Sequence, residues 1–180
     1  LGEEHWDWDH GGDNYVTLID PNDLDTMYLE GMFGSMARKY LKTGKSRGIR
    51  PGPAPEGKKL RFNWMTPFIL SHDDSKKLYA GANMLFKSEN RGDSWKCISP
   101  DLSTNPGPER QGDVPFGTIT DISESALKKG LLYAGTDDGQ LHMTRDDGAT
   151  WTKINKGLPN RWVSRVVASK HDEGTVFVSL

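Results

Sequence analysis

A period of about 50 residues constrains this chain more than any other feature of its sequence. Four segments each contain an apolar strand, a polar turn rich in Asp, Ser, Lys or Gly, and a second apolar strand. The second strands carry aromatic residues spaced 51, 54 and 44 residues apart, namely Tyr28, Tyr79, Tyr133 and Phe177. A unit of this size is typical of one β-propeller blade, which buries its apolar face against its neighbours.

The two middle units continue into a third strand and a turn that ends in tryptophan. These segments read MLFKSENRGDSW (84–95) and LHMTRDDGATW (141–151). Aligned, they place Ser88, Asn90, Gly92, Ser94 and Trp95 on Thr144, Asp146, Gly148, Thr150 and Trp151. The first unit has a weaker version with Thr43, Gly44 and Lys45 in the turn and no tryptophan.

The repeat predicts an all-β fold: a β-propeller of four-stranded antiparallel blades, of which about three and a half are present. The expected blades cover residues 15–51, 64–100, 117–154 and 162–180, and the last contains two strands. Closed propellers have four to eight blades, because an open disc leaves strand edges unpaired. We therefore expect a segment of a longer chain, or one subunit of an assembly that closes the disc.

The turn motif has a folding role that accounts for each of its residues. The Asp or Asn side chain accepts backbone N–H groups further round the turn, and glycine supplies a positive φ. Ser or Thr begins the fourth strand, and the indole covers the hydrophobic layer of the blade. A calcium loop would need further oxygen ligands and a distal Glu, which TRDDGATWTKIN lacks. We expect these residues to be structural and to bind no metal.

Both turns resemble the Asp box, S-x-D-x-G-x-T-W, of the bacterial-neuraminidase (BNR) repeat. The second copy differs in Thr144, and the first differs in Asn90 and Ser94. That motif occurs in propellers of sialidases, some xyloglucanases, photosystem assembly factors and the sortilin (VPS10) family. The longer sequence segments that contain these motifs, residues 61–102 and 117–151, resemble sortilin-like bacterial proteins described as glycosyl hydrolases. In these relatives the Asp box lies away from the ligand-binding face, so the resemblance assigns it no catalysis.

The densest cluster of chemically active side chains is EEHWDWDHGGD, residues 3–13. On an extended strand Asp7 and Asp9 share one face, and Trp6 and Trp8 share the other. Carboxylates about 6 to 7 Å apart are close to the spacing of an inverting glycosidase, and tryptophan faces suit sugar rings. Asp7 and Asp9 are thus candidate catalytic residues, and Trp6, Trp8 and His10 are candidate ligand-binding residues. A polar loop whose aromatics pack on a neighbouring blade is the alternative.

Asp113 is a further candidate catalytic residue. It lies in QGDVPFGTIT, just before an expected first strand, where propeller loops reach the ligand face. A loop-capping aspartate is the alternative explanation.

Composition excludes several other classes of function. The net charge is -2 and basic residues are scattered, so we expect no nucleic-acid partner. No apolar run approaches the roughly 18 to 20 residues of a membrane span. The single cysteine, Cys97, forms no internal disulfide, and the motif LKTGKS lacks the first glycine of a phosphate-binding loop. We expect no cofactor.

Three function classes remain open. The chain is a module that binds a glycan, protein or peptide, a glycoside hydrolase with paired carboxylates, or a subunit of a multi-chain assembly. The resemblance to sortilin-like and glycosidase-like proteins implies the first class and a location outside the cytoplasm.

Overall fold

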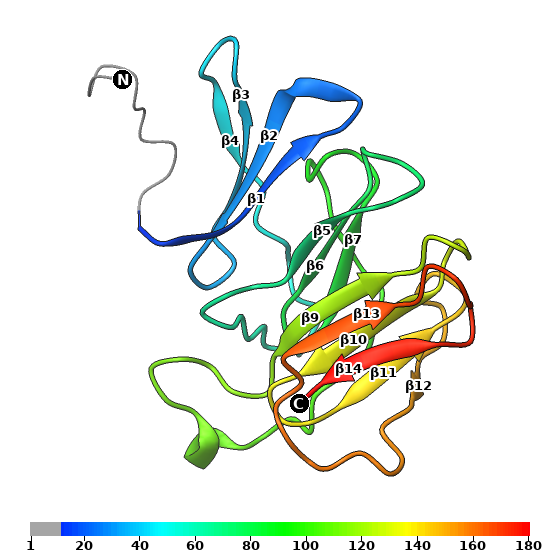
Figure 1. Ribbon diagram of the computed structural model, residues 1–180. Helices are drawn as coiled ribbons and strands as arrows, with labels where there is room; N and C mark the ends of the chain where they lie inside the picture. The colour runs from blue at the N-terminus through cyan, green and yellow to red at the C-terminus, as the bar shows by residue number, and fades with distance from the viewer. Residues whose placement is uncertain (1–11) are drawn as a thin grey trace, which may run out of the picture.

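The computed structural model describes residues 12–180 and contains three four-stranded antiparallel sheets and one two-stranded sheet (Figure 1). The first sheet contains β1 (Asn14–Asp20), β2 (Asp23–Gly31), β3 (Met36–Tyr40) and β4 (Ser46–Gly48). The second contains β5 (Phe68–Leu70), β6 (Leu78–Gly81), β7 (Leu85–Ser88) and β8 (Lys96–Cys97). The third contains β9 (Ile119–Glu124), β10 (Leu132–Thr136), β11 (Leu141–Thr144) and β12 (Thr152–Lys153). The last contains β13 (Arg165–Ala168) and β14 (Val176–Ser179).

Within each sheet the strands follow one another in chain order, so every sheet is a meander. The direction of the chain gives each sheet two distinct ends. At one end, called here the loop face, the first strand begins and the long connections 49–67, 98–118 and 154–164 run between sheets. At the other end, called the hairpin face, the third strand turns into the fourth. The expected all-β architecture of four-stranded antiparallel sheets is confirmed.

The hydrophobic core lies between the sheets, and the recurring aromatic residue of each unit is buried by the sheet that follows. Tyr28 packs in one cluster with Phe68 of the second sheet, and Tyr79 packs with Ile119 of the third. Tyr133 likewise lies in a cluster with Val166 of the last sheet. Phe177 holds the same position in β14, where its side chain is 62% exposed. The face of β14 that carries Phe177 is therefore uncovered within residues 12–180.

Each tryptophan of the turn motif binds the preceding sheet. The Nε1–H of Trp95 donates to the carbonyl oxygen of Ile49 at 2.8 Å, and that of Trp151 donates to Ile98 at 2.7 Å. Ile49 and Ile98 directly follow the fourth strand of their sheets, where their N–H groups donate to the third strand. Ile154 has the same backbone bond in the third sheet. The indole therefore joins two blades, in addition to covering apolar surface.

The glycine of each motif allows this close approach. Gly92 and Gly148 have φ values of 84° and 92°, a region that disfavours other residues. A Cβ atom on Gly148 would lie 2.6 Å from the Ile98 carbonyl oxygen, and one on Gly92 would lie 2.8 Å from the Ile49 Cβ. Each glycine is therefore required by its backbone conformation and by the neighbouring sheet.

We predict that Gly148→Ala destabilises the protein more than Gly157→Ala. Both glycines have a positive φ, but a Cβ atom on Gly157 meets no atom within 4 Å. The conformational cost is shared, so the difference reports the contact between sheets and is expected to be about 1 to 3 kcal/mol. Urea denaturation followed by tryptophan fluorescence measures it. Equal losses of stability would show that the contact has no energetic weight.

Candidate functional site

The side chains of the second turn motif are hydrogen-bonded to one another and to the turn backbone. Asp146 Oδ1 accepts the Thr150 N–H at 2.8 Å and the Thr144 hydroxyl at 2.7 Å, while its Oδ2 accepts the Thr150 hydroxyl at 2.6 Å. The Gly148 N–H donates to Thr144 Oγ1 at 3.0 Å. The Thr150 hydroxyl, followed by the Thr150 N–H, lowers the pKa of Asp146 to about 2. Its carboxylate oxygens are thus engaged in the turn.

The first turn motif forms the same pattern with neutral groups. Asn90 Oδ1 accepts the Ser94 N–H at 2.9 Å, and its Nδ2 donates to Ser94 Oγ at 2.9 Å. The Gly92 N–H donates to Ser88 Oγ at 2.8 Å. An amide in place of the carboxylate leaves the turn geometry intact, because one acceptor oxygen satisfies the backbone.

The residue just before the motif glycine points to the preceding sheet. Asp147 accepts a hydrogen bond from Lys87 Nζ at 2.7 Å and from the Tyr79 hydroxyl at 3.2 Å. Arg91, at the same position of the first motif, donates to Asp20 at 3.1 Å. Both residues have a positive φ, 57° for Asp147 and 59° for Arg91. The charge at this position is thus negative in one motif and positive in the other, and in each case the partner in the preceding sheet has the opposite charge.

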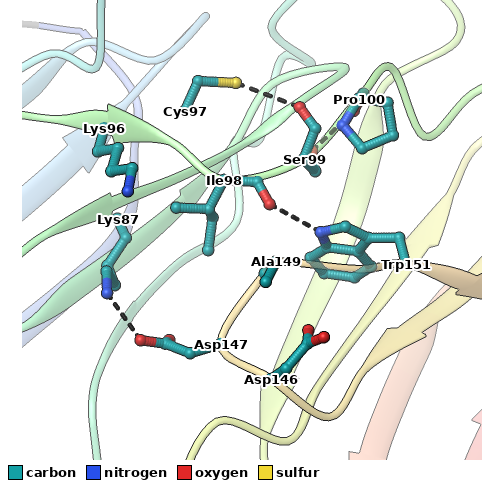
Figure 2. A pocket seen from close by; sticks show the side chains of 11 residues that line it. Lys87, Lys96, Cys97, Ile98, Ser99, Pro100, Asp146, Asp147, Ala149 and Trp151 are labelled. Carbon is teal, nitrogen blue, oxygen red and sulfur yellow. Dashed lines mark hydrogen bonds and ion pairs between the residues drawn. The ribbon is translucent and has the colours of Figure 1, made fainter.

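A groove of about 670 Å³ lies between the second and third sheets, where the turn motif of the third sheet meets β8 and the residues that follow it (Figure 2). Figure 2 shows Lys87 reaching Asp147 across the groove and the Trp151 indole pointing to the Ile98 carbonyl. Cys97 also lines it, and burial raises the pKa of its thiol, which disfavours the reactive thiolate. The Lys87, Asp147 and Trp151 side chains already form hydrogen bonds between the two blades. We therefore interpret this groove as part of the interface between blades, not as a ligand site.

A different pocket, of about 290 Å³, opens on the loop face and is called here the channel-mouth pocket. It is formed where the first strand of each of the four sheets begins. Its lining residues are Tyr15, Val16, Met65, Thr66, Pro67, Phe68, Ile69, Thr120, Asp121, Ser164 and Arg165. Because all four sheets contribute, this pocket marks the point on which the blades converge.

The channel-mouth pocket combines a buried carboxyl group, a cation and apolar surface. Asp121 Oδ2 accepts the Val166 N–H at 2.6 Å, and its Oδ1 lies 3.6 Å from Arg165 Nη1. Burial raises the pKa of Asp121. The Arg165 side chain is largely exposed, and Met65 is 57% exposed. A pocket with a few polar groups on an apolar lining is the usual form of a ligand site.

Glu30 lies directly behind this pocket and is completely buried. Its Oε1 accepts the N–H of Thr66, a lining residue, at 3.0 Å, while Oε2 has no hydrogen-bond partner within the described residues. Burial raises the pKa of Glu30 to about 8. The group is therefore largely protonated at neutral pH, so β2 carries no full negative charge where it meets the second sheet.

Of the candidate site residues predicted from the sequence, the described part of the structure contains Asp113 alone. Asp113 is exposed in the connection between a short 3-10 helix (Pro108–Arg110) and β9, and it does not line the channel-mouth pocket. Asp7, Asp9, Trp6, Trp8 and His10 lie outside the described residues.

Sequence reasoning missed Asp121, Glu30 and Arg165. Asp121 and Glu30 lie in strands whose other residues are mixed polar and apolar, in ITDISE and DLDTMYLEG, and both are buried. Other acidic residues lie in the same strands, among them Asp25 and Glu124, so the sequence pattern alone does not single out the two carboxyl groups of the site.

Among residues 12–180, no group of three or more His, Cys, Asp or Glu side chains is arranged to hold a metal ion. In the same part of the chain, no helix has the length and apolar character needed to cross a membrane.

The chain matches no protein-family model and no curated protein sequence. It is similar to solved structures, among them an ancestral GH74 enzyme with a TM-score of 0.60 and 17% identity over 93% of this chain. The GH74 xyloglucanase from Xanthomonas campestris gives a TM-score of 0.53 and 21% identity over 84% of this chain. An extracellular domain from Bacteroides thetaiotaomicron gives a TM-score of 0.58 and 18% identity over 92% of this chain.

The chain spans 22%, 24% and 20% of the lengths of these three structures. At such low identity the likeness establishes the fold alone. The predicted partial β-propeller is confirmed.

We predict that Glu30 makes the protein less stable as the pH rises from about 4.5 to 8. In this window the native state keeps a proton on Glu30, whose pKa is about 8, and the unfolded chain releases it. Unfolding therefore releases a proton, and the free energy of unfolding falls with pH, by an amount on the order of a few kcal/mol. Glu30→Gln stays neutral at every pH and is expected to remove this loss.

Chemical denaturation of the wild type and Glu30→Gln at several pH values between 4 and 9 measures the effect. Glu56→Gln, a change at an exposed glutamate, is the matched control and should follow the wild type. Parallel pH profiles for wild type and Glu30→Gln would contradict the prediction.

Proposed function

We propose that this chain is a segment of an Asp-box (BNR) repeat β-propeller, similar to sortilin-like and glycosidase-like proteins, that binds a carbohydrate ligand on its loop face. The observation that carries the proposal is the channel-mouth pocket, to which the first strands of all four sheets contribute. Here Met65 offers exposed apolar surface beside the charged groups of Asp121 and Arg165. Apolar surface with a few fixed polar groups suits a sugar, which has both kinds of surface.

The hairpin face supports the Asp-box assignment. In both turn motifs equivalent side chains accept the same two backbone N–H groups, and each tryptophan binds the preceding sheet. Two of the similar structures are GH74 enzymes, one of them a xyloglucanase, and a third is an extracellular domain. These names favour a glycan ligand and a location outside the cytoplasm for this chain, and both remain part of the proposal.

A glycoside hydrolase is the second candidate function, and Asp121 favours it. A general acid needs a raised pKa, and burial raises that of Asp121 inside the channel-mouth pocket. The second carboxylate would come from Asp7, Asp9 or another blade, since Asp113 does not line this pocket. Asp121→Asn separates the two functions, since Asn retains an acceptor for the Val166 N–H. A binding module releases no product from the glycan in either form, whereas a hydrolase releases product as the wild type and loses this turnover in Asp121→Asn.

The third proposed role concerns closure of the propeller, which a partner subunit or further blades would complete. The last sheet has two strands, and Phe177 on β14 is exposed where its equivalents are buried. We propose that a further blade, from the same chain or from a partner subunit, covers this face. This completion is compatible with ligand binding, because it concerns the lateral face of the last sheet.

We predict that Met65→Ala and Arg165→Ala each weaken carbohydrate binding by about tenfold, by removing apolar contact or a charged donor. Isothermal titration calorimetry with xyloglucan oligosaccharides and a set of other neutral cell-wall oligosaccharides measures this. The matched controls are Leu24→Ala, an exposed leucine at the hairpin-face end of β2, and Lys170→Ala, an exposed cation between β13 and β14. Both controls should bind like the wild type.

The proposal is overturned if no oligosaccharide binds, or if the channel-mouth variants bind as tightly as the controls. Binding of peptides instead, with the same sensitivity to Met65→Ala and Arg165→Ala, would replace the carbohydrate with a protein ligand.

A further inference from the structure

A second pocket on the loop face, of about 250 Å³, lies over the third sheet and is called here the blade-three pocket. The turn between β10 and β11 and the connections 98–118 and 154–164 form it. Its lining residues include Arg110, Phe116, Asp137, Asp138, Arg161 and Trp162. It shares no lining residue with the channel-mouth pocket.

The floor of the blade-three pocket consists of two carboxylates that are saturated by internal hydrogen bonds. Asp137 Oδ1 accepts the N–H groups of Gly117 and Thr118, each at 2.9 Å. Asp138 Oδ2 accepts the N–H of Thr104 at 2.6 Å and its hydroxyl at 2.7 Å. Both aspartates are almost completely buried. They fix the shape of the pocket, and their oxygens at its floor accept hydrogen bonds from the protein itself.

The rim of the pocket consists of unpaired cations and an exposed indole. The Arg110 guanidinium lies over the Phe116 ring at 4.8 Å, an arrangement that leaves its in-plane N–H donors available. Arg161 is exposed, and within residues 12–180 neither guanidinium has a hydrogen-bond or ion-pair partner. Trp162 is 48% exposed beside them. The rim therefore offers charged donors and an aromatic face.

We propose that the blade-three pocket binds a uronic acid residue of an acidic polysaccharide. The sugar ring packs on the Trp162 indole, and its carboxylate binds the guanidinium groups of Arg110 and Arg161, which match a carboxylate in geometry and charge. The buried Asp137 and Asp138 offer only acceptor oxygens at the floor and no donor for a carboxylate, so the acid group turns toward the rim. The proposal rests on carbohydrate binding as the function and names a ligand class for a second site.

Calorimetric titration with tetragalacturonate and with its fully methyl-esterified form tests this proposal. The ester keeps the sugar rings and removes the charge, so we expect the acid to bind at least about tenfold more tightly. Trp162→Ala should weaken binding of both forms, and Arg161→Gln should weaken binding of the acid alone, each by about tenfold. Phe177→Ala and Lys170→Gln, which change an exposed aromatic and an exposed cation elsewhere, should have no effect.

Equal binding of acid and ester, or full affinity in Trp162→Ala and Arg161→Gln, overturns the acidic subsite. The proposed function survives those outcomes if neutral oligosaccharides still bind and Met65→Ala still weakens them. Failure of every oligosaccharide to bind overturns both. Binding of poly-glutamate with the same loss in both variants would show that the pocket takes acidic peptides, and would also overturn the proposal.

Discussion

Each motif tryptophan donates a hydrogen bond to an isoleucine carbonyl oxygen at the end of the preceding sheet, and this bond joins consecutive blades. Trp95 reaches Ile49 and Trp151 reaches Ile98, and the motif glycine lets the turn approach the same isoleucine. A buried carbonyl needs such a donor, and the donor comes from the next repeat. Each sheet is therefore completed by its neighbour, which is why the packing continues from sheet to sheet.

This arrangement divides the molecule into two ends with different roles. On the hairpin face, charged groups such as Asp147 and Arg91 bind partners in the preceding sheet. On the loop face, Met65 and Trp162 in the long connections and Arg165 at the start of β13 are exposed beside pockets. The second end is where variation in the loops changes the ligand without disturbing the contacts between sheets.

Much of the fold was predictable from the sequence, because the strand and turn pattern repeats in local segments. The contacts between sheets were not, since they join residues more than 30 positions apart. The Trp151 indole was expected to cover its own blade's apolar layer, and nothing in TRDDGATW indicates that its N–H binds Ile98. The channel-mouth pocket was missed for the same reason, because Asp121 and Tyr15 meet only after four sheets converge. The candidate cluster at residues 3–13 lies almost wholly outside the described residues and stays a prediction.

Hydrogen–deuterium exchange in Trp151→Phe tests most directly whether the motif binds the preceding sheet. Phenylalanine keeps the aromatic surface and removes the donor to Ile98. We predict faster exchange at the Ile98 amide, which bonds to Leu85 in the second sheet, as well as in the turn around Asp146. Faster exchange confined to the third sheet, with Ile98 protected as in the wild type, would contradict this account.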